Sequence, residues 1–179
     1  MGKYDQYVFP IPKPKMKNSL GNCEFELLTY DRESDPNCVF RMEVVQMDTE
    51  GAGSGFGSPM MDPNTGEVRG QWPHAHCVDE IYMFVGTNPD DVWDLGGTLE
   101  IWLGEGEDAE KFLIDTPTAI HIPAGLVHMP WVIRELHRNF LMIAMPMSPL
   151  LNDSYVAVNN LPPSIEEPEW CKDFEKIMK

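Results

Sequence analysis

The sequence has few cysteines, and none of them lies in a metal-binding or disulfide motif. Cys23, Cys38, Cys77 and Cys171 are scattered along 179 residues without any Cys-x-x-Cys pair. This spacing indicates neither a zinc knuckle nor a disulfide framework. We therefore expect reduced thiols, and a fold held together by its core rather than by cross-links.

Basic residues and long apolar runs are also scarce. The chain has 13 Lys and Arg residues against 29 Asp and Glu residues, which gives a formal net charge of -16. That charge argues against binding to nucleic acid or to anionic membranes, both of which repel an acidic surface. No apolar run is long enough to span a bilayer, and the start, MGKYDQY, does not resemble a signal sequence. We expect a cytoplasmic protein.

Two short segments carry the strongest functional signal. Residues 73–80 read PHAHCVDE, and residues 123–128 read PAGLVH. If the first segment is a β-strand, its two histidines and its glutamate fall on one face, because alternate side chains of a strand point the same way. On a helix, positions two apart diverge by about 200°. Three imidazoles and one carboxylate on a β-scaffold predict a metal site with these ligands: His74, His76, Glu80 and His128.

The rest of the chain is rich in short strand-like segments and poor in helical patterns. β-Branched and aromatic residues gather in runs that end at turn signals such as the GTNP sequence of residues 86–89. Many short strands with frequent turns predict an all-β sandwich or barrel. Strands are expected at residues 23–30, 39–47, 74–85, 97–104, 110–114, 119–122 and 139–145.

At its two histidine motifs the chain resembles the cupin superfamily. The first cupin motif pairs His-x-His with a Glu four residues beyond the second His, and the second motif ends in Pro-x-Gly-x-x-His. Both patterns occur here, at residues 74–80 and 123–128. The resemblance covers about residues 39–145. It implies a double-stranded β-helix, or jelly roll, with one metal ion on the four ligands named above.

Some supporting positions depart from the cupin motifs. Val68 stands where a glycine is expected six residues before the first His, and Gly86 comes one residue early. In the second motif, Pro117 replaces the leading glycine and Val132 replaces the closing asparagine. These changes concern turns and supporting positions rather than ligands. Residues 86–97 also resemble an insertion in a subset of stand-alone, single-domain cupins.

Three regions are expected along the chain. Residues 1–22 form a proline-rich extended arm, residues 23–150 form the barrel, and residues 151–179 form a C-terminal extension. Ser164 and Glu167 form a capping box in this extension, and apolar residues follow it at helical spacing. A short amphipathic helix is therefore expected to end the chain.

Two segments are expected to be loops. Residues 51–70 are rich in glycine and lead directly into the first histidine motif, so we expect them to border the mouth of the pocket. Phe56, Met60 and Met61 are candidates for its apolar wall. The acidic residues 90–94 lack the spacing of a calcium-binding EF-hand loop, and a charged hairpin loop is the favoured interpretation.

Two residues of the first histidine segment need a separate interpretation. Tyr82 shares the strand parity of the ligands, so it is a candidate catalytic residue that faces the cavity as a proton donor. A buried barrel tyrosine is the simpler interpretation. Cys77 alternates to the opposite face and is expected to be a packing residue rather than a ligand.

The remaining histidines and two arginines are weaker candidates. His121 is expected to face away from the barrel interior, and His137 lies in a polar connection where an exposed side chain is expected. Arg41 and Arg134 are candidates for binding a substrate carboxylate. In a chain this acidic, an ion pair with Asp or Glu is the simpler explanation for both.

The ligand set favours an enzyme that binds a small polar substrate at its metal. Three histidines and one carboxylate leave open coordination positions for substrate or dioxygen on Fe or Mn, the favoured metals, or on Zn, Ni, Co or Cu. A dioxygenase or another oxidoreductase is expected, with isomerase or lyase chemistry as further options. The alternative is a non-catalytic cupin that binds a small ligand through its metal. Cupins often dimerise through their terminal strands, so a homodimer is expected.

Overall fold

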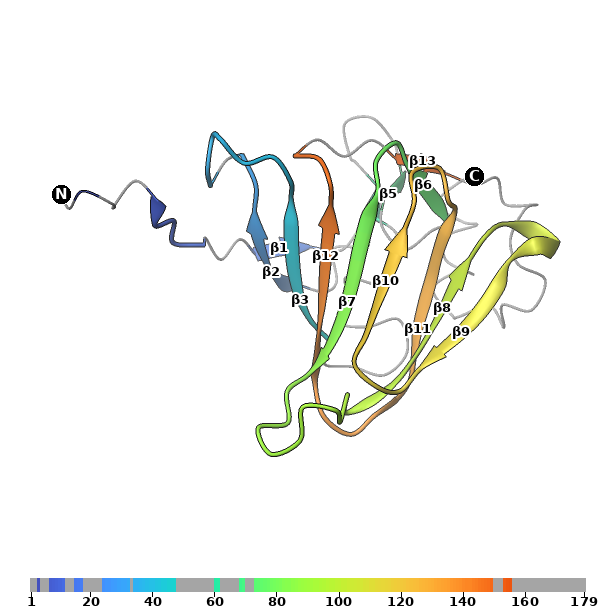
Figure 1. Ribbon diagram of the computed structural model, residues 1–179. Helices are drawn as coiled ribbons and strands as arrows, with labels where there is room; N and C mark the ends of the chain where they lie inside the picture. Colours follow the sequence, from blue (N-terminus) through green and yellow to red (C-terminus); the bar gives the residue numbers. More distant parts are fainter. Residues whose placement is uncertain are drawn as a thin grey trace.

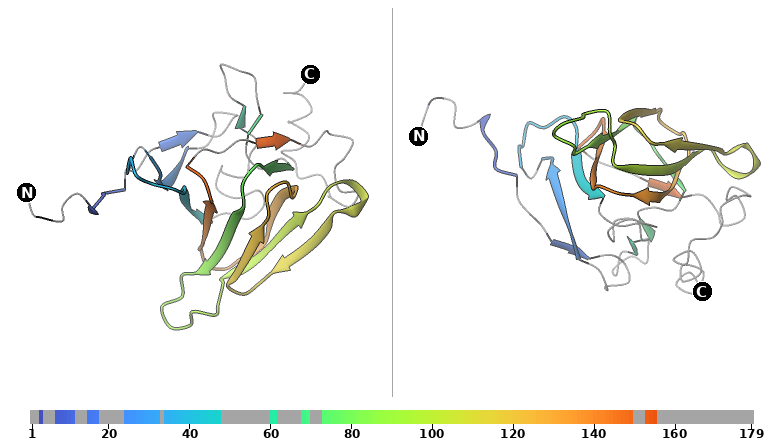
Figure 2. Two further views of the ribbon diagram at one scale, coloured as in Figure 1. Left: turned by 45° about the horizontal axis from the view of Figure 1, so that its top comes forward. Right: turned by 90° about the horizontal axis from the view of Figure 1, so that it is seen from below.

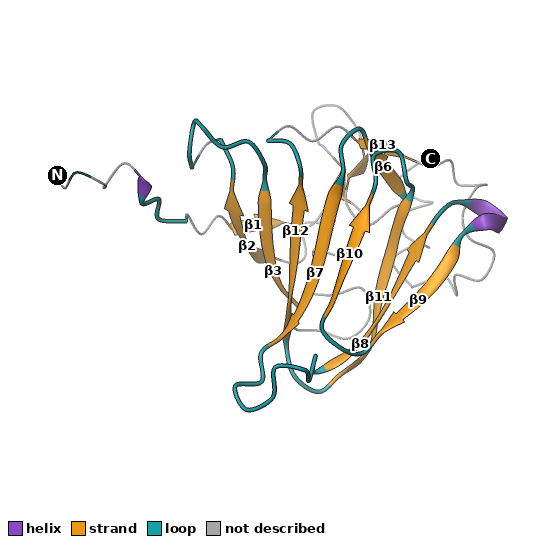
Figure 3. Cartoon of the chain, in the orientation of Figure 1, coloured by secondary structure: helices purple, strands orange, loops and turns teal. Residues whose placement is uncertain are grey.

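The described part of the chain consists almost entirely of β-strands and the turns between them. The structure is a computed structural model, and it describes residues 3, 7–11, 15–17, 24–32, 34–47, 60–61, 68–69, 73–149 and 153–155. Figure 3 shows the strands, with only short helical turns among these residues. One of these turns is a 3-10 helix at Gly106–Asp108, inside the acidic connection between two strands. No helix in this part of the chain has the length and apolar character needed to cross a bilayer.

The described residues form thirteen strands, which make two large antiparallel sheets and one small one (Figure 1). The six-stranded sheet has the order β1-β2-β3-β12-β7-β10, the five-stranded sheet has the order β13-β6-β11-β8-β9, and β4 pairs with β5. The strands are β1 Lys15–Lys17, β2 Glu24–Tyr30, β3 Met42–Met47, β4 Met60–Met61, β5 Val68–Arg69, β6 His74–His76, β7 Glu80–Gly86, β8 Gly97–Leu103, β9 Glu110–Ile114, β10 Thr118–Ile122, β11 His128–Leu136, β12 Phe140–Pro146 and β13 Asp153–Tyr155.

The two large sheets enclose one hydrophobic core (Figures 1 and 2). Alternation along the strands sorts the side chains: in β12, Phe140, Met142 and Ala144 are buried, and the residues between them are only half-buried. Phe84 from the six-stranded sheet and Trp131 from the five-stranded sheet are fully buried in the same cluster. This arrangement is a jelly-roll sandwich, so the predicted all-β class is confirmed.

Several predicted features lie outside the described residues. These include Phe56, most of the glycine-rich segment and the C-terminal helix, which is therefore not confirmed. Met60 and Met61 form the short strand β4. The division of the chain into an arm, a barrel and an extension stays a prediction. Within the arm, β1 occupies the edge of the six-stranded sheet, as its proline-rich surroundings require.

The prediction of a single strand at residues 74–85 is wrong, because the chain forms two strands there. β6 belongs to the five-stranded sheet and β7 to the six-stranded sheet, and residues 77–79 cross between them. The histidines of β6 and Glu80 of β7 therefore approach each other from opposite sheets rather than by alternation along one strand. Cys77 lies in this crossing and is exposed, so its expected packing role is also wrong.

The loop between β7 and β8 is held in place by hydrogen bonds to Asp94 and by a close backbone approach at Gly86. A Cβ atom on Gly86 would overlap the carbonyl oxygen of Asp94, so the close approach of the loop requires glycine there. The carboxylate of Asp94 accepts hydrogen bonds from the Gly96 N–H, from Asn88 Nδ2 and from Arg138 Nη1. These donors occupy Asp94, which fits a charged hairpin loop better than a calcium site.

A candidate metal centre between the two sheets

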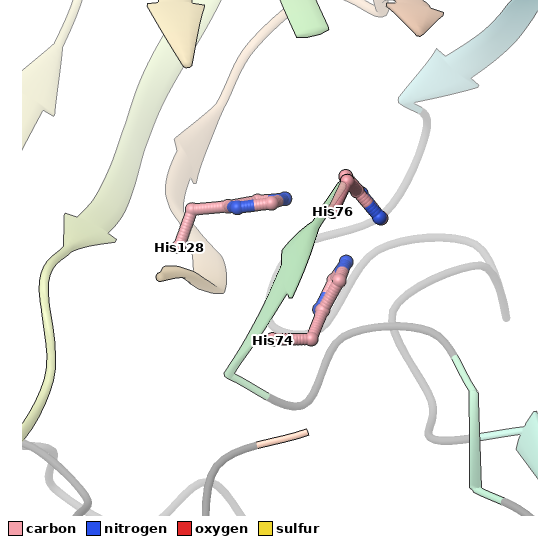
Figure 4. Close-up of side chains that lie close together, drawn as sticks. All are labelled: His74, His76 and His128. Carbon is pink, nitrogen blue, oxygen red and sulfur yellow. The ribbon is translucent and has the colours of Figure 1, made fainter. Parts of the chain in front are cut away.

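Three buried histidines come together at one end of the sandwich. His74 and His76 lie on β6, and His128, the first residue of β11, pairs directly with His74 across the sheet. One ring nitrogen of each lies within 4.8 Å of the other two. The side chains are 6%, 5% and 0% exposed, in the order His74, His76 and His128. Figure 4 shows the three rings gathered around one common space.

Glu80 approaches the same cluster from the other sheet. It is the first residue of β7 and is 3% exposed. Its Oε2 atom lies 3.2 Å from His76 Nε2 and 3.4 Å from His128 Nε2. Despite these distances, neither Glu80 Oε2 nor His128 Nε2 has a partner in hydrogen-bond geometry. Buried polar atoms without hydrogen bonds cost free energy, and a cation bound between them would remove that cost.

The charge state of Glu80 suits a metal ligand. Burial alone would raise its pKa, but the contacts with His128 and His76 outweigh burial and lower the pKa of Glu80 to about 2. The carboxylate is therefore ionised at neutral pH. An ionised carboxylate beside imidazole nitrogens is a suitable donor set for a divalent transition metal.

The backbone fixes the tautomer of His128. Its Nδ1 atom lies 3.1 Å from the carbonyl oxygen of Leu126, which can only accept a hydrogen bond. We assign a ring proton to Nδ1 on this basis, so Nε2 is the nitrogen that faces the cluster and is placed to coordinate a metal. Metal-binding histidines generally donate their other ring N–H in this way, because the contact orients the ring and raises the basicity of the free nitrogen.

The turn before His128 connects the two histidine motifs. Gly125 has a φ of +83°, a conformation that favours glycine, and the Leu126 N–H donates to the Pro123 carbonyl over 3.0 Å. The Gly125 N–H donates to the carbonyl oxygen of His76 over 2.9 Å. The glycine of the second motif therefore ties its turn directly to a ligand of the first motif.

An irregularity in β11 directly follows His128. The pairing of β11 with β8 shifts between His128 and Trp131, and Met129 has a φ of +80°. A bulge bends its strand and redirects the neighbouring side chains. The left-handed conformation costs a non-glycine residue about 1 kcal/mol or more. No feature of the sequence indicates this distortion.

Tyr82 lies beside the histidine cluster. It is 3% exposed, and its ring centroid is 5.8 Å from that of His128, with the two rings edge to face. Tyr82 also pairs with Ile120 of β10, inside the six-stranded sheet. The tyrosine is thus both a buried barrel residue and a neighbour of the cluster.

The other two histidines lie away from the cluster. His121 is exposed, and its Nε2 lies 3.1 Å from the Asp79 carboxylate. His137 is exposed in the turn between β11 and β12. The structure does not bring either residue to the three buried imidazoles.

Both candidate arginines form ion pairs within the chain. Arg41 pairs with Glu43 at 2.5 Å. Arg134 donates two hydrogen bonds to the buried Glu100, from Nε over 2.9 Å and from Nη2 over 3.0 Å. These pairs match the simpler interpretation of the two arginines.

Sequence reasoning missed two parts of this site. β13 pairs with β6 along its whole length, and β11 pairs with the other side of β6 at His74, so His74 has a strand on either side. Asp79 binds the turn at Ala124, 45 positions further along the chain. The Asp-Glu pair at the end of the first motif is the only local hint of a role for Asp79, and its partner can be found only from the fold.

Comparisons with known proteins give a fold rather than an activity. No family model and no curated protein matches the chain. Among solved structures, the chain is similar to the vicilin from Solanum melongena, with a TM-score of 0.50 and 12% identity over 85% of this chain and 35% of the vicilin. At this identity the likeness shows the fold alone.

Two further solved structures are less similar. An oxalate oxidase in complex with glycolate has a TM-score of 0.45 and 16% identity, over 73% of this chain and 54% of that one. The hydroxypropylphosphonic acid epoxidase from S. wedmorenis has a TM-score of 0.44 and 12% identity, over 78% and 58%. The chain spans about a third of the length of the vicilin and just over half of the other two.

Proposed function

We propose that this chain, which has the fold of the cupin superfamily, holds one divalent transition metal ion through three imidazoles and one carboxylate. The observation that carries the proposal is the pair of buried atoms Glu80 Oε2 and His128 Nε2, which face each other without a hydrogen bond. Three converging imidazoles and a fixed tautomer at His128 support it. The proposed ligands are His74, His76, Glu80 and His128.

The proposed metal is Fe(II) or Mn(II), and the same donors suit zinc, nickel, cobalt or copper. When bound, the metal would supply Lewis acidity and open positions at which the oxygen atoms of a substrate could coordinate. The protein contributes an ionised Glu80, which partly neutralises the metal charge, and walls that exclude water. Ile122 and Met129, 1% and 3% exposed, belong to the core cluster that closes around this end of the sandwich.

The proposed activity is that of an enzyme acting on a small polar substrate that chelates the metal. A dioxygenase or another oxidoreductase is favoured, and an isomerase or lyase would use the same site. Tyr82 is the proposed catalytic residue: its buried ring lies against His128, from where its hydroxyl can hold or donate a proton at a substrate oxygen.

Metal content tests the site directly. Elemental analysis of the purified wild-type protein is expected to give one transition metal ion per chain. His76→Ala should lose that metal while keeping a folded barrel, whereas His121→Ala, which changes an exposed histidine outside the cluster, should keep it. Equal metal content in all three proteins would contradict the proposed ligand set.

Activity is tested separately from metal binding. The protein is reconstituted with Fe(II) under anaerobic conditions, and dioxygen uptake is measured across catechols, thiols, diketones and hydroxy acids. Tyr82→Phe is expected to keep its iron and to lower turnover about 100-fold, the usual effect of removing a proton donor. An absence of uptake with every substrate would remove the dioxygenase proposal and leave isomerisation and elimination to be assayed.

A non-catalytic cupin that binds a small ligand is the second candidate. It is favoured by the sparse acid–base equipment of the site, where Tyr82 is the group that the described residues place beside the ligand cluster. A ligand recovered unchanged from the loaded protein after long incubation would support this candidate. Formation of a product would exclude it.

We also propose a homodimer that meets through the outer face of the six-stranded sheet. From Leu28 of β2 across to β10, the outward residues identified from strand alternation and register include no Asp, Glu, Lys or Arg, whereas the register of β1 with β2 places Lys15, Lys17, Glu24 and Glu26 at the edge of the same face. In a chain of net charge -16, two copies can meet over β3, β12, β7 and β10 without opposing their carboxylates. The outward residues are Leu28, Tyr30, Met42, Val44, Gln46, Ile81, Met83, Val85, Ala119, His121, Leu141, Ile143 and Met145.

Light scattering after size exclusion tests this dimer. Met83, 37% exposed on β7 within the face, is changed to Lys, and the variant is expected to run as a monomer. Trp93→Lys is the matched control, because Trp93 is 72% exposed but lies in the loop beyond the sheet. A monomeric wild type, or a dimer that survives Met83→Lys, would contradict the proposal.

We further propose a cytoplasmic location, which the free thiols of Cys38 and Cys77 fit.

A further inference from the structure

Asp79 joins three separate parts of the chain at the edge of the histidine cluster. Its Oδ1 atom accepts a hydrogen bond from the Ala124 N–H over 2.9 Å, and its Oδ2 atom lies 3.1 Å from His121 Nε2. Its carbonyl oxygen accepts the N–H of Met147 over 2.8 Å. The residue that follows it in the chain is Glu80. Asp79 therefore connects the crossing between β6 and β7 with the turn after β10 and with the end of β12.

The turn that Asp79 holds is in contact with two of the proposed metal ligands. Next to Ala124, the Gly125 N–H donates to the carbonyl oxygen of His76 over 2.9 Å. One residue further, the carbonyl oxygen of Leu126 lies 3.1 Å from His128 Nδ1. A shift of this turn would therefore move the backbone of one ligand and the ring partner of another.

We propose that Asp79 is a positioning residue for the metal site. Its carboxylate holds the turn in the one place where Leu126 can orient His128 while Gly125 binds His76. This inference rests on the proposed metal-binding function and adds a residue that does not itself touch the metal. Groups that support ligands from outside typically contribute 10-fold to 100-fold to metal affinity, because they fix the ligands before the metal arrives.

The alternative role for Asp79 is purely structural: it would stabilise the turn and have no effect on the metal. The carboxylate side chain is half exposed, at 50%, so water can replace it as the partner of the Ala124 N–H. With a purely structural role, replacing Asp79 would change the stability of the metal-free protein and leave the affinity for metal unchanged. A positioning residue would change the affinity and the geometry of the bound metal.

The test compares three variants of the full chain with Co(II) as the probe. Asp79→Ala removes the acceptor for the Ala124 N–H. Asp79→Asn keeps an oxygen that can accept the same hydrogen bond. His121→Ala removes the other partner of Asp79 and leaves the bond to the turn intact. Titration gives the Co(II) affinity, the visible absorption of bound Co(II) reports its ligand geometry, and thermal unfolding is measured without metal.

We expect Asp79→Ala to weaken Co(II) binding about 10-fold or more and to change the absorption bands. Asp79→Asn should recover most of the affinity, and His121→Ala should match the wild type. Wild-type affinity and bands in Asp79→Ala would overturn the inference even if unfolding shifts, and so would an Asp79→Asn protein as weak as Asp79→Ala. A wild type that binds no Co(II) would instead refute the proposed function, and the inference with it.

Discussion

Among the described side chains, each of the two large sheets buries one glutamate, and the two glutamates differ in what surrounds them. Glu80 of β7 and Glu100 of β8 are both 3% exposed. Glu100 accepts a hydrogen bond from Trp102 Nε1 over 2.9 Å and two more from Arg134. Among the described residues, the nitrogens of His76 and His128 lie near Glu80 Oε2, and none of these residues forms a hydrogen bond with it.

This contrast separates a structural carboxylate from one that is suited to a ligand. The donors of Glu100 come from its own strand and from β11, so the chain completes that ion pair by itself. Among the described residues, the chain supplies no such donors to Glu80 Oε2 and places basic nitrogens there instead. The same residue type at the same burial thus has two roles, and the partner atoms distinguish them.

Replacing the two glutamates one at a time by glutamine should have its largest effect on metal affinity. Glu80→Gln should weaken Zn(II) or Mn(II) binding about 100-fold, because losing a ligand costs at least as much as losing a supporting contact. Glu100→Gln, the matched change in the other sheet, should leave the affinity unchanged. Isothermal titration measures both. A similar loss in the two variants would mean that the two carboxylates do not differ in role.

The second effect is on the stability of the metal-free protein. Glu100→Gln should lower the free energy of unfolding by about 2 kcal/mol, because the Arg134 guanidinium loses its charged acceptor. Urea denaturation measures this difference. Added metal should raise the unfolding temperature of Glu100→Gln as it does for the wild type, but not that of Glu80→Gln. A stable Glu100→Gln protein would show that the ion pair contributes little.

The stability contributed by Glu100 should depend on pH. Burial alone would raise the pKa of Glu100, but the hydrogen bonds from Arg134 and Trp102 outweigh burial and lower it. A lowered pKa means that the contribution is complete above the ordinary carboxyl pKa, about 4.3. The contribution is lost as the pH falls through the lowered pKa.

Unfolding of the wild type and of Glu100→Gln across the acid range tests this dependence. The gap in unfolding free energy should stay constant at neutral pH and close in acid. A gap that widens as the pH falls would contradict the sign of the pKa shift.

The smallest effect should come from the indole donor of Glu100. Trp102→Phe removes one of its three hydrogen bonds and keeps an aromatic ring in the same place, so a loss of about 1 kcal/mol in unfolding free energy is expected. Metal affinity should stay at the wild-type value. A change in metal affinity would mean that the ion pair of Glu100 with Arg134 affects the histidine cluster. That result would contradict the separate roles of Glu80 and Glu100.

Much of the fold follows from local patterns in the sequence. Strands such as β9 at Glu110–Ile114 were predictable because their residues favour strands and turn signals flank them. The spacing of the two histidine motifs also selected His74, His76, Glu80 and His128 as one set. That set could be named without the structure because each of its members has a fixed position in one of the two cupin-like motifs.

The features that sequence reasoning missed depend on partners far away in the chain. The break at residues 77–79 contains no glycine or proline to indicate a turn, and only pairing with β11 and β13 assigns β6 to the other sheet. The φ of Met129 follows from the register of β11 against β8. The contact of Asp79 with Ala124 likewise exists only once two distant turns are brought together.

The central claim is that the contrast between Glu80 and Glu100 marks a metal site, and a crystal structure with anomalous scattering tests it most directly. The predicted result is one anomalous peak about 2.0–2.2 Å from an imidazole nitrogen of each clustered histidine and from a carboxylate oxygen of Glu80. Glu100 should keep its hydrogen bonds with Arg134 and Trp102. A crystal grown with Mn(II) or Zn(II) that shows no peak there, or a peak that Glu80 does not contact, would contradict the account.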